Sequence, residues 1–174
     1  MLIDKDKSTL IVIDVQEKLV SVMPKPRNFI DNIIKLLKAA KILKINNVVS
    51  EQYPKGLGTT LDKIKETFYE KTKKIEKTDF SVPFNGNSLK EQCIICGIEA
   101  HVCVLQTAIN LAKIKKVYIV QDAISSRYQK DYLTALSRLD KNPNIQIVSS
   151  EMVLFEWLKS SDHPEFKTIS QLIK

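Results

Sequence analysis

Long apolar runs are missing from this 174-residue chain. No stretch approaches the roughly 18 uninterrupted apolar residues of a membrane-spanning helix. The first ten residues, MLIDKDKSTL, lack the apolar core of a secretory signal. Cysteine is also scarce, and its odd number, three, favours free thiols in a reducing compartment. We therefore expect a cytoplasmic protein without a membrane segment.

Arginine is the second scarcity, although the formal net charge is +7. Only three of the 27 basic residues are arginines: Arg27, Arg127 and Arg138. Recognition of phosphates and bases favours arginine, because its guanidinium donates two parallel hydrogen bonds. The lysines are instead scattered along the chain, with one dense run, KTKKIEK, at 71–77. This composition favours a lysine-rich solvated surface. A non-catalytic binding or assembly protein, with nucleic-acid affinity through its lysines, is the alternative to an enzyme.

Short apolar runs alternate with amphipathic segments along the whole chain. Helices are expected at 26–44, 102–114, 130–139, 151–158 and 164–174, with a weaker one at 61–69. Six runs are long enough for buried strands: 8–14, 46–52, 73–78, 92–97, 116–122 and 145–150. This alternation predicts one α/β domain over 1–174, with a three-layer Rossmann-like fold. Its six-stranded, mostly parallel sheet would have the order 3-2-1-4-5-6 and helices on both faces.

Chemically useful residues follow the predicted strands. Asp14 ends the first strand, Lys77 lies at the end of the third, and Cys103 comes one loop after the fourth. In a doubly wound sheet, ligands bind at the carboxyl ends of the strands where the strand order reverses. The first and fourth strands flank that point. We therefore expect Asp14 and Cys103 to face each other across it.

The stretch QCIICGIEAHVCVL at 92–105 contains all three cysteines and one of the two histidines. This cluster could be a metal site, a redox pair or a nucleophile with its neighbours. Cys93 and Cys96 point to opposite faces of a strand, so they cannot grip one ion together and are expected to be core packing. His101 and Cys103 lie about 200° apart around a helix and do not form a dyad. The other histidine, His163, sits in a polar tail segment. If Cys103 is a nucleophile, we therefore do not expect its base to be histidine.

Asp14 and Lys77 supply what a nucleophilic Cys103 would need. A carboxylate can accept the thiol proton and later return it to a leaving amine. A helix start and a nearby ammonium both favour the thiolate, so the pKa of Cys103 is expected to be lowered. Backbone amides at the same helix start can bind an oxyanion.

Several segments, in order along nearly the entire chain, resemble the isochorismatase-like cysteine hydrolases, which include nicotinamidases and N-carbamoyl amidases. They are LIVIDVQEKL, SEQYPKGLGTT, KTDFS, CGIEAHVCVLQTA, VQDAISSR, SEMVLFEWL and HPEFKTISQLIK. The resemblance is strongest to the branch of isochorismatase domain-containing proteins, whose substrate is generally unassigned.

The resemblance implies a triad of Asp14 as general base, Lys77 as supporting cation and Cys103 as nucleophile. It also implies a cis peptide between Ile98 and Glu99, which helps to aim the amides of Glu99 and Cys103 into an oxyanion hole. Members of the family assemble as dimers, tetramers or larger, so a homo-oligomer is expected.

Two departures from the family narrow the expected function. Nicotinamidases bind a metal through an aspartate and histidines just after the second strand, where this chain has EQYPK with Gln52 and no histidine. No metal and no other cofactor are therefore expected. Isochorismatases proper lack the cysteine and act on a vinyl ether, so Cys103 argues against that reaction.

The sequence thus predicts a metal-independent cysteine hydrolase that cleaves a small amide or carbamoyl-type substrate through a thioester. The residues expected to line its pocket are Gln16, Tyr53, Phe80 and Phe84.

Overall fold

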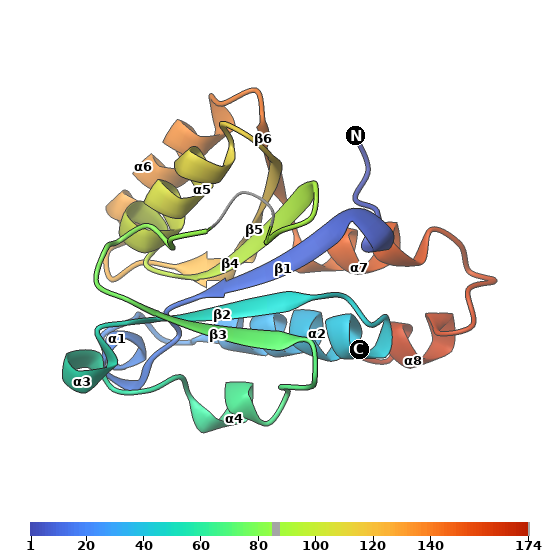
Figure 1. Cartoon of the computed structure of the whole chain (residues 1–174), viewed down its shortest axis with the longest axis horizontal. Helices are drawn as coiled ribbons and strands as arrows, with labels where there is room; N and C mark the ends of the chain where they lie inside the picture. The colour runs from blue at the N-terminus through green and yellow to red at the C-terminus, as the bar shows by residue number, and fades with distance from the viewer. Residues whose placement is uncertain (85–87, 174) are drawn as a thin grey trace.

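The computed structural model describes residues 1–84 and 88–173, and a six-stranded sheet runs through its centre (Figure 1). The strand order is β3-β2-β1-β4-β5-β6, as predicted, and every neighbouring pair is parallel. The strands are β1 (Ser8–Ile13), β2 (Asn47–Gln52), β3 (Thr72–Lys77), β4 (Gln92–Ile98), β5 (Lys116–Ser125) and β6 (Ile145–Val148). The carboxyl ends of β1 and β4 are therefore neighbours, which confirms the predicted reversal point.

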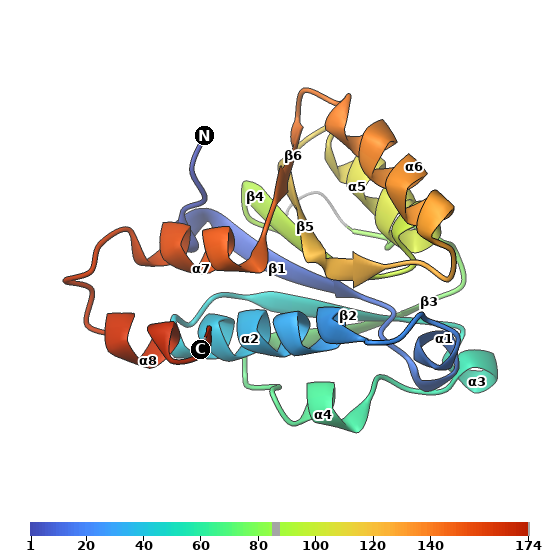
Figure 2. The ribbon, with the colours of Figure 1, turned by 180° about the vertical axis from the view of Figure 1, so that it is seen from behind.

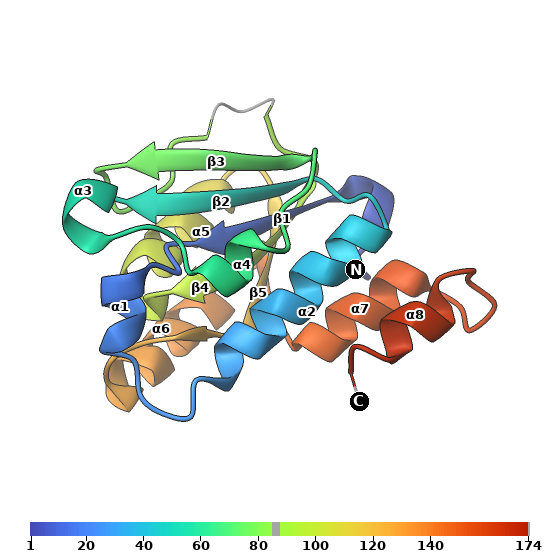
Figure 3. The ribbon, with the colours of Figure 1, turned by 90° about the horizontal axis from the view of Figure 1, so that it is seen from below.

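Helices cover both faces of the sheet, so the predicted three layers are confirmed. Figures 2 and 3 show α2 and α7 on one face and α5 and α6 on the other. The longer helices are α2 (Asn28–Ile42), α5 (Leu105–Leu111), α6 (Gln129–Asp140) and α7 (Ser150–Leu158). The short ones are η1 (Lys5–Lys7), α1 (Glu17–Ser21), α3 (Pro54–Leu57), α4 (Asp62–Lys65), η2 (Ala100–Val104) and α8 (Phe166–Ser170). Over the described ranges, no helix combines the length and apolarity that crossing a membrane requires.

Several boundaries differ from the sequence prediction, most of them by a few residues, and three of the differences are described here. The expected helix at 61–69 shrinks to α4, since Thr67 and Phe68 turn back to bond the carbonyls of Ile64 and Lys65. The helix expected to begin at 102 begins at Ala100 as the wide turn η2. Strand β5 continues to Ser125, because its end pairs with β4 again after a register shift.

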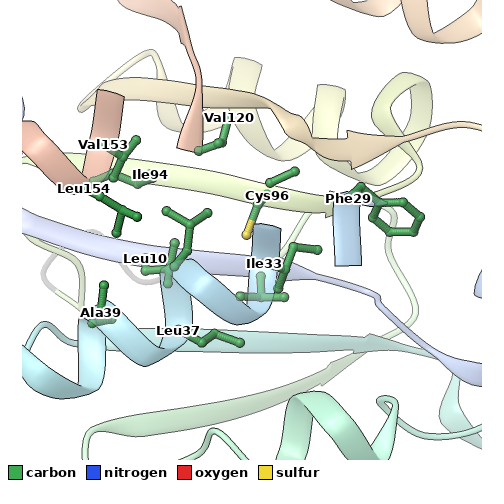
Figure 4. Close-up of a cluster of buried hydrophobic side chains, with 14 of the residues drawn as sticks. Leu10, Phe29, Ile33, Leu37, Ala39, Ile94, Cys96, Val120, Val153 and Leu154 are labelled. Atoms are coloured by element: carbon green, nitrogen blue, oxygen red, sulfur yellow. The ribbon is translucent and has the colours of Figure 1, made fainter. Parts of the chain in front are cut away.

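Two cores lie on opposite sides of the sheet, because successive strand residues point to opposite faces. Leu10, Ile94 and Cys96 face α2 and α7, as Figure 4 shows. Cys93 and Ile95 belong to the core on the side of α5. The two cysteines thus point in opposite directions, which confirms their predicted role as packing residues.

Gly97 allows the ends of β1 and β4 to approach closely. It pairs with Ile13 and has a φ of +115°, where side chains are rarely tolerated. A Cβ on Gly97 would lie 2.1 Å from the carbonyl oxygen of Ile13. This glycine therefore sets the spacing between Asp14, which follows Ile13, and the turn that carries Cys103.

Replacing Gly97 tests that close approach. We expect Gly97→Ala to lower the free energy of unfolding by at least about 2 kcal/mol, since it combines a clash with main chain and an unfavourable φ. Gly56→Ala is the matched control: the nearest atoms to its Cβ, at 2.3 Å, would belong to the exposed Tyr53 ring and not to main chain. Urea unfolding measures both variants. Equal stability of the two would contradict the constraint.

Candidate active site

Asp14, Lys77 and Cys103 converge at the carboxyl ends of the strands. Asp14 directly follows β1 and is 0% exposed, with a φ of +51° that turns the chain out of the strand. Lys77 is the last residue of β3, two strands away, and its long side chain crosses the end of β2. Its Nζ lies 2.7 Å from Asp14 Oδ2, and both side chains are almost fully buried. The pair is a buried salt bridge.

Both oxygens of the Asp14 carboxylate are engaged. Ser50, on β2, donates from its hydroxyl to Asp14 Oδ1 at 2.6 Å, while Lys77 holds Oδ2. The Asp14 amide also donates to the Ser50 carbonyl, at 3.1 Å. A buried charge is tolerated only when it is paired and hydrogen-bonded, and Asp14 meets both conditions.

The Lys77 ammonium is surrounded by acceptors. Gln52 Oε1 accepts at 2.6 Å, and the carbonyl oxygens of Asp79 and Phe80 accept at 3.3 and 3.2 Å. Gln52 is fixed in turn, because its Nε2 donates to the carbonyl of Thr78 at 2.6 Å. The segment after β3 therefore folds around the lysine and holds it against Asp14.

Sequence reasoning did not assign Ser50 and Gln52 to this network. Both are buried polar residues in NVVSEQ, a strand in which all six residues are buried. A polar side chain inside a fully buried strand must find a hydrogen-bond partner, and that was the available signal.

Cys103 lies in η2 and is 5% exposed. Burial raises the pKa of its thiol to about 12, and the negative charge of Asp14 adds to the increase while Lys77 opposes it. The expected lowering of this pKa is therefore wrong. The positive charge of Lys77 is already balanced by Asp14, so burial dominates and favours the neutral thiol over the thiolate.

The turn before Cys103 has the cis peptide between Ile98 and Glu99 that the family resemblance implied. The Glu99 carbonyl accepts from the amides of Val102 and Val104, at 3.1 and 3.2 Å. Cys103 therefore lies in the first turn of a helix, between two residues that are both bonded to Glu99. The oxyanion role expected of the Glu99 and Cys103 amides stays a prediction.

A cavity of about 470 Å³ lies at the end of β3; Lys77 lines it, whereas Asp14 and Cys103 do not. Lys77 and the expected pocket residue Tyr53 both line it, together with Asp79 and Pro83. Tyr53 is 54% exposed. An exposed aromatic ring at this cavity is consistent with a pocket role, which stays a prediction.

The other expected pocket residues have different surroundings. Phe80 is 53% exposed, and Phe84 packs partly buried against the core on the α5 side. Gln16 is 0% exposed, and its amide group binds the main chain of Gln52 at 2.7 and 3.0 Å and the Gly58 carbonyl at 2.7 Å. These contacts tie together the loops after β1 and β2 and favour a structural role for Gln16.

The residues at the end of β2 do not fit the metal site of nicotinamidases. The amide of Gln52 is shared between Lys77 and Thr78. The buried Glu51 carboxylate accepts from the amide and hydroxyl of Thr60, at 2.8 and 2.7 Å, and from Lys74 at 3.2 Å. Burial would raise the pKa of Glu51, but these contacts hold it below its ordinary value. Within the described ranges, no three His, Cys, Asp or Glu side chains gather as a possible metal site.

Comparison with known proteins identifies the family. The model of the isochorismatase domain matches residues 8–151. Isochorismatase domain-containing protein 2 of Danio rerio is 40% identical over 95% of this chain and 86% of its own length. The chain belongs to the isochorismatase family.

Solved structures show the same fold. The MAR1 ribonuclease from Caenorhabditis elegans has a TM-score of 0.93 and 37% identity, over 99% of this chain and 92% of its own. YcaC from Escherichia coli, described as an octameric hydrolase of unknown specificity, has a TM-score of 0.85 and 20% identity, over 99% and 89%. At that identity, YcaC shows a likeness of fold alone.

The raised pKa of Cys103 predicts how its alkylation depends on pH. Below pH 12 the thiol carries less thiolate than a free cysteine, so iodoacetamide should label Cys103 at least about 10-fold more slowly than N-acetylcysteine at pH 8. The Cys103 rate should climb steadily to pH 10 without a plateau. Peptide mass spectrometry separates Cys103 from Cys93 and Cys96, and circular dichroism checks folding. A plateau below pH 8 would show a thiolate at rest.

Proposed function

Because the chain belongs to the isochorismatase family, we propose that it is a metal-independent cysteine hydrolase. Its substrate would be a small amide or carbamoyl-type compound, and the reaction would pass through a thioester on Cys103. The observation that carries the proposal is the Asp14 carboxylate, buried, fixed by Ser50 and Lys77, and acting on the Cys103 thiol.

In the proposed reaction, Asp14 takes the thiol proton as the Cys103 sulfur attacks the carbonyl carbon. The carbonyl π electrons move to oxygen, where backbone amides of the Cys103 turn would stabilise the negative charge. Collapse of this intermediate breaks the C–N bond, and Asp14 gives its proton to the leaving amine. Water then attacks the thioester with Asp14 again as base, which releases the acid and restores the thiol.

The raised pKa of the Cys103 thiol bears on how its sulfur is activated. With a thiol pKa of about 12, forming a thiolate before substrate binds at pH 7 would cost on the order of 7 kcal/mol. Transfer of the proton to Asp14 during the attack avoids placing a second negative charge beside the carboxylate. We therefore propose concerted proton transfer rather than a standing thiolate.

Ribonuclease activity is the second candidate. The C. elegans relative at 37% identity is named a ribonuclease, and the +7 net charge would attract RNA. The buried Asp14, Lys77 and Cys103 are, however, suited to acyl transfer rather than to binding a phosphodiester, for which arginine is the preferred ligand.

The cytoplasmic location and the homo-oligomer are also proposals. Three free cysteines support a reducing compartment. Leu2, Met152 and Phe155 are 74%, 48% and 40% exposed and line one groove, and such apolar surface favours assembly.

Turnover of small amides tests the proposed reaction. A panel of primary amides and N-carbamoyl amines should yield at least one compound from which the wild type releases ammonia. Cys103→Ala should abolish this activity, and Asp14→Asn should reduce it by about 10²–10⁴-fold through loss of the base. Cys93→Ala, which replaces a buried cysteine of β4, serves as the control that keeps the activity.

The same preparations incubated with labelled RNA separate the two candidates. The hydrolase proposal predicts no RNA cleavage that depends on Cys103. It would be contradicted by Cys103-dependent RNA cleavage without amide turnover, or by amide turnover that survives Cys103→Ala.

A further inference from the structure

The segment that follows β5 contacts the turn that carries Cys103. Strands β4 and β5 remain paired to their ends, with Gly97 opposite Ile124 and Ile98 opposite Ser125. The next residues of the two strands, Glu99 on one side and Ser126 and Arg127 on the other, therefore leave the sheet side by side. Ser126 and Arg127 belong to the motif VQDAISSR, to which the proposed mechanism gives no role.

Arg127 grips the side chain of Glu99. The carboxylate oxygen Oε2 of Glu99 accepts from the Arg127 backbone amide at 2.9 Å and from Arg127 Nε at 3.1 Å. The Glu99 side chain is 8% exposed, whereas that of Arg127 is 50% exposed. One arginine thus binds a buried carboxylate with both its main chain and its guanidinium.

A second contact comes from Ser126, the residue before Arg127. His101 Nδ1 lies 3.0 Å from the hydroxyl oxygen of Ser126, which is 2% exposed. Glu99 and His101 are therefore both tied to the consecutive residues Ser126 and Arg127. Because the Glu99 carbonyl binds the amides of Val102 and Val104, fixing Glu99 also fixes the main chain on both sides of Cys103.

We propose that Arg127, acting through the Glu99 carboxylate, is a positioning residue for the oxyanion hole. The inference rests on the proposed function, which needs the amides of Glu99 and Cys103 aimed at a developing oxyanion. Arg127 would hold the turn in place and would also balance the Glu99 carboxylate. An unpaired carboxylate on that turn would repel the oxyanion through a medium of low polarity.

Binding of a small aldehyde to Cys103 distinguishes a positioning role of Arg127 from general support of the fold. The Cys103 sulfur adds to the aldehyde carbon, the carbonyl electron pair moves to oxygen, and the thiol proton ends on that oxygen as a hemithioacetal. The adduct oxygen occupies the place of the oxyanion. Alkylation by iodoacetamide uses the same sulfur but creates no such oxygen, so it reports on the thiol alone.

The experiment uses ¹³C-labelled acetaldehyde and NMR to measure the dissociation constant of the hemithioacetal, with Cys103→Ala as the blank. Glu99→Ala should weaken the adduct about 10-fold. Losing a donor to a charged oxyanion costs about 10²–10³-fold, and the hemithioacetal oxygen carries no full charge. Glu99→Gln, which keeps an oxygen acceptor, should lose less. Arg127→Ala should lose about 3–10-fold, because its backbone amide still binds Glu99.

Controls make the outcomes distinct. Arg138→Ala, an exposed arginine on α6, should leave the adduct unchanged. In every variant except the blank, alkylation of Cys103 should stay within about 2-fold of wild type at a fixed pH. Arg127→Lys keeps the positive charge but lacks the planar guanidinium. Its adduct should therefore be tighter than that of Arg127→Ala and weaker than that of the wild type.

Two results would overturn the inference in different ways. If the wild type forms the adduct and the Glu99 and Arg127 variants hold it equally well, the positioning role is wrong and the proposed function stands. If the wild type forms no adduct on Cys103, there is no working oxyanion hole, and both proposals fall together.

Discussion

The buried ion pair between Asp14 and Lys77 is the constraint on which the rest of the site depends. It joins the centre of the sheet to its edge strand, across β2, at a depth where water cannot solvate either charge. Such a pair is tolerated only with further hydrogen bonds, and Ser50, Gln52 and the carbonyls after β3 provide them. The path of the chain after β3 therefore follows from the need to satisfy one lysine.

The same pair determines the state of the thiol. Because the Asp14 carboxylate already balances the Lys77 charge, burial of the Cys103 thiol outweighs the attraction of its thiolate to Lys77. The pKa of the thiol is therefore raised rather than lowered. A neutral thiol beside a held carboxylate is poised to pass on a proton only when an electrophile arrives. The proposed mechanism thus assigns Lys77 to keeping the Asp14 carboxylate in place, while Asp14 moves the proton.

The sequence predicted the strand order and the meeting of Asp14 with Cys103, because both follow from apolar periodicity and from where polar residues end buried strands. It also separated Cys93 from Cys96 by strand alternation. The pKa of Cys103 could not be predicted, since its direction depends on burial and on the charge balance of neighbours distant in sequence. The contact of Arg127 with Glu99 was equally hidden, because it arises from the extension of β5 to Ser125 beyond its apolar run.

A double-mutant cycle on the ion pair tests the central claim most directly. Unfolding in urea would compare Asp14→Asn, Lys77→Met and the double variant, with Lys73→Met as the exposed lysine control on the same strand. Each single change should cost about 3–5 kcal/mol, because it leaves a buried charge without its partner. The double variant should cost at least about 1 kcal/mol less than the sum of the two. Costs that add to within about 0.5 kcal/mol would show that the two side chains do not depend on each other, and would contradict the account.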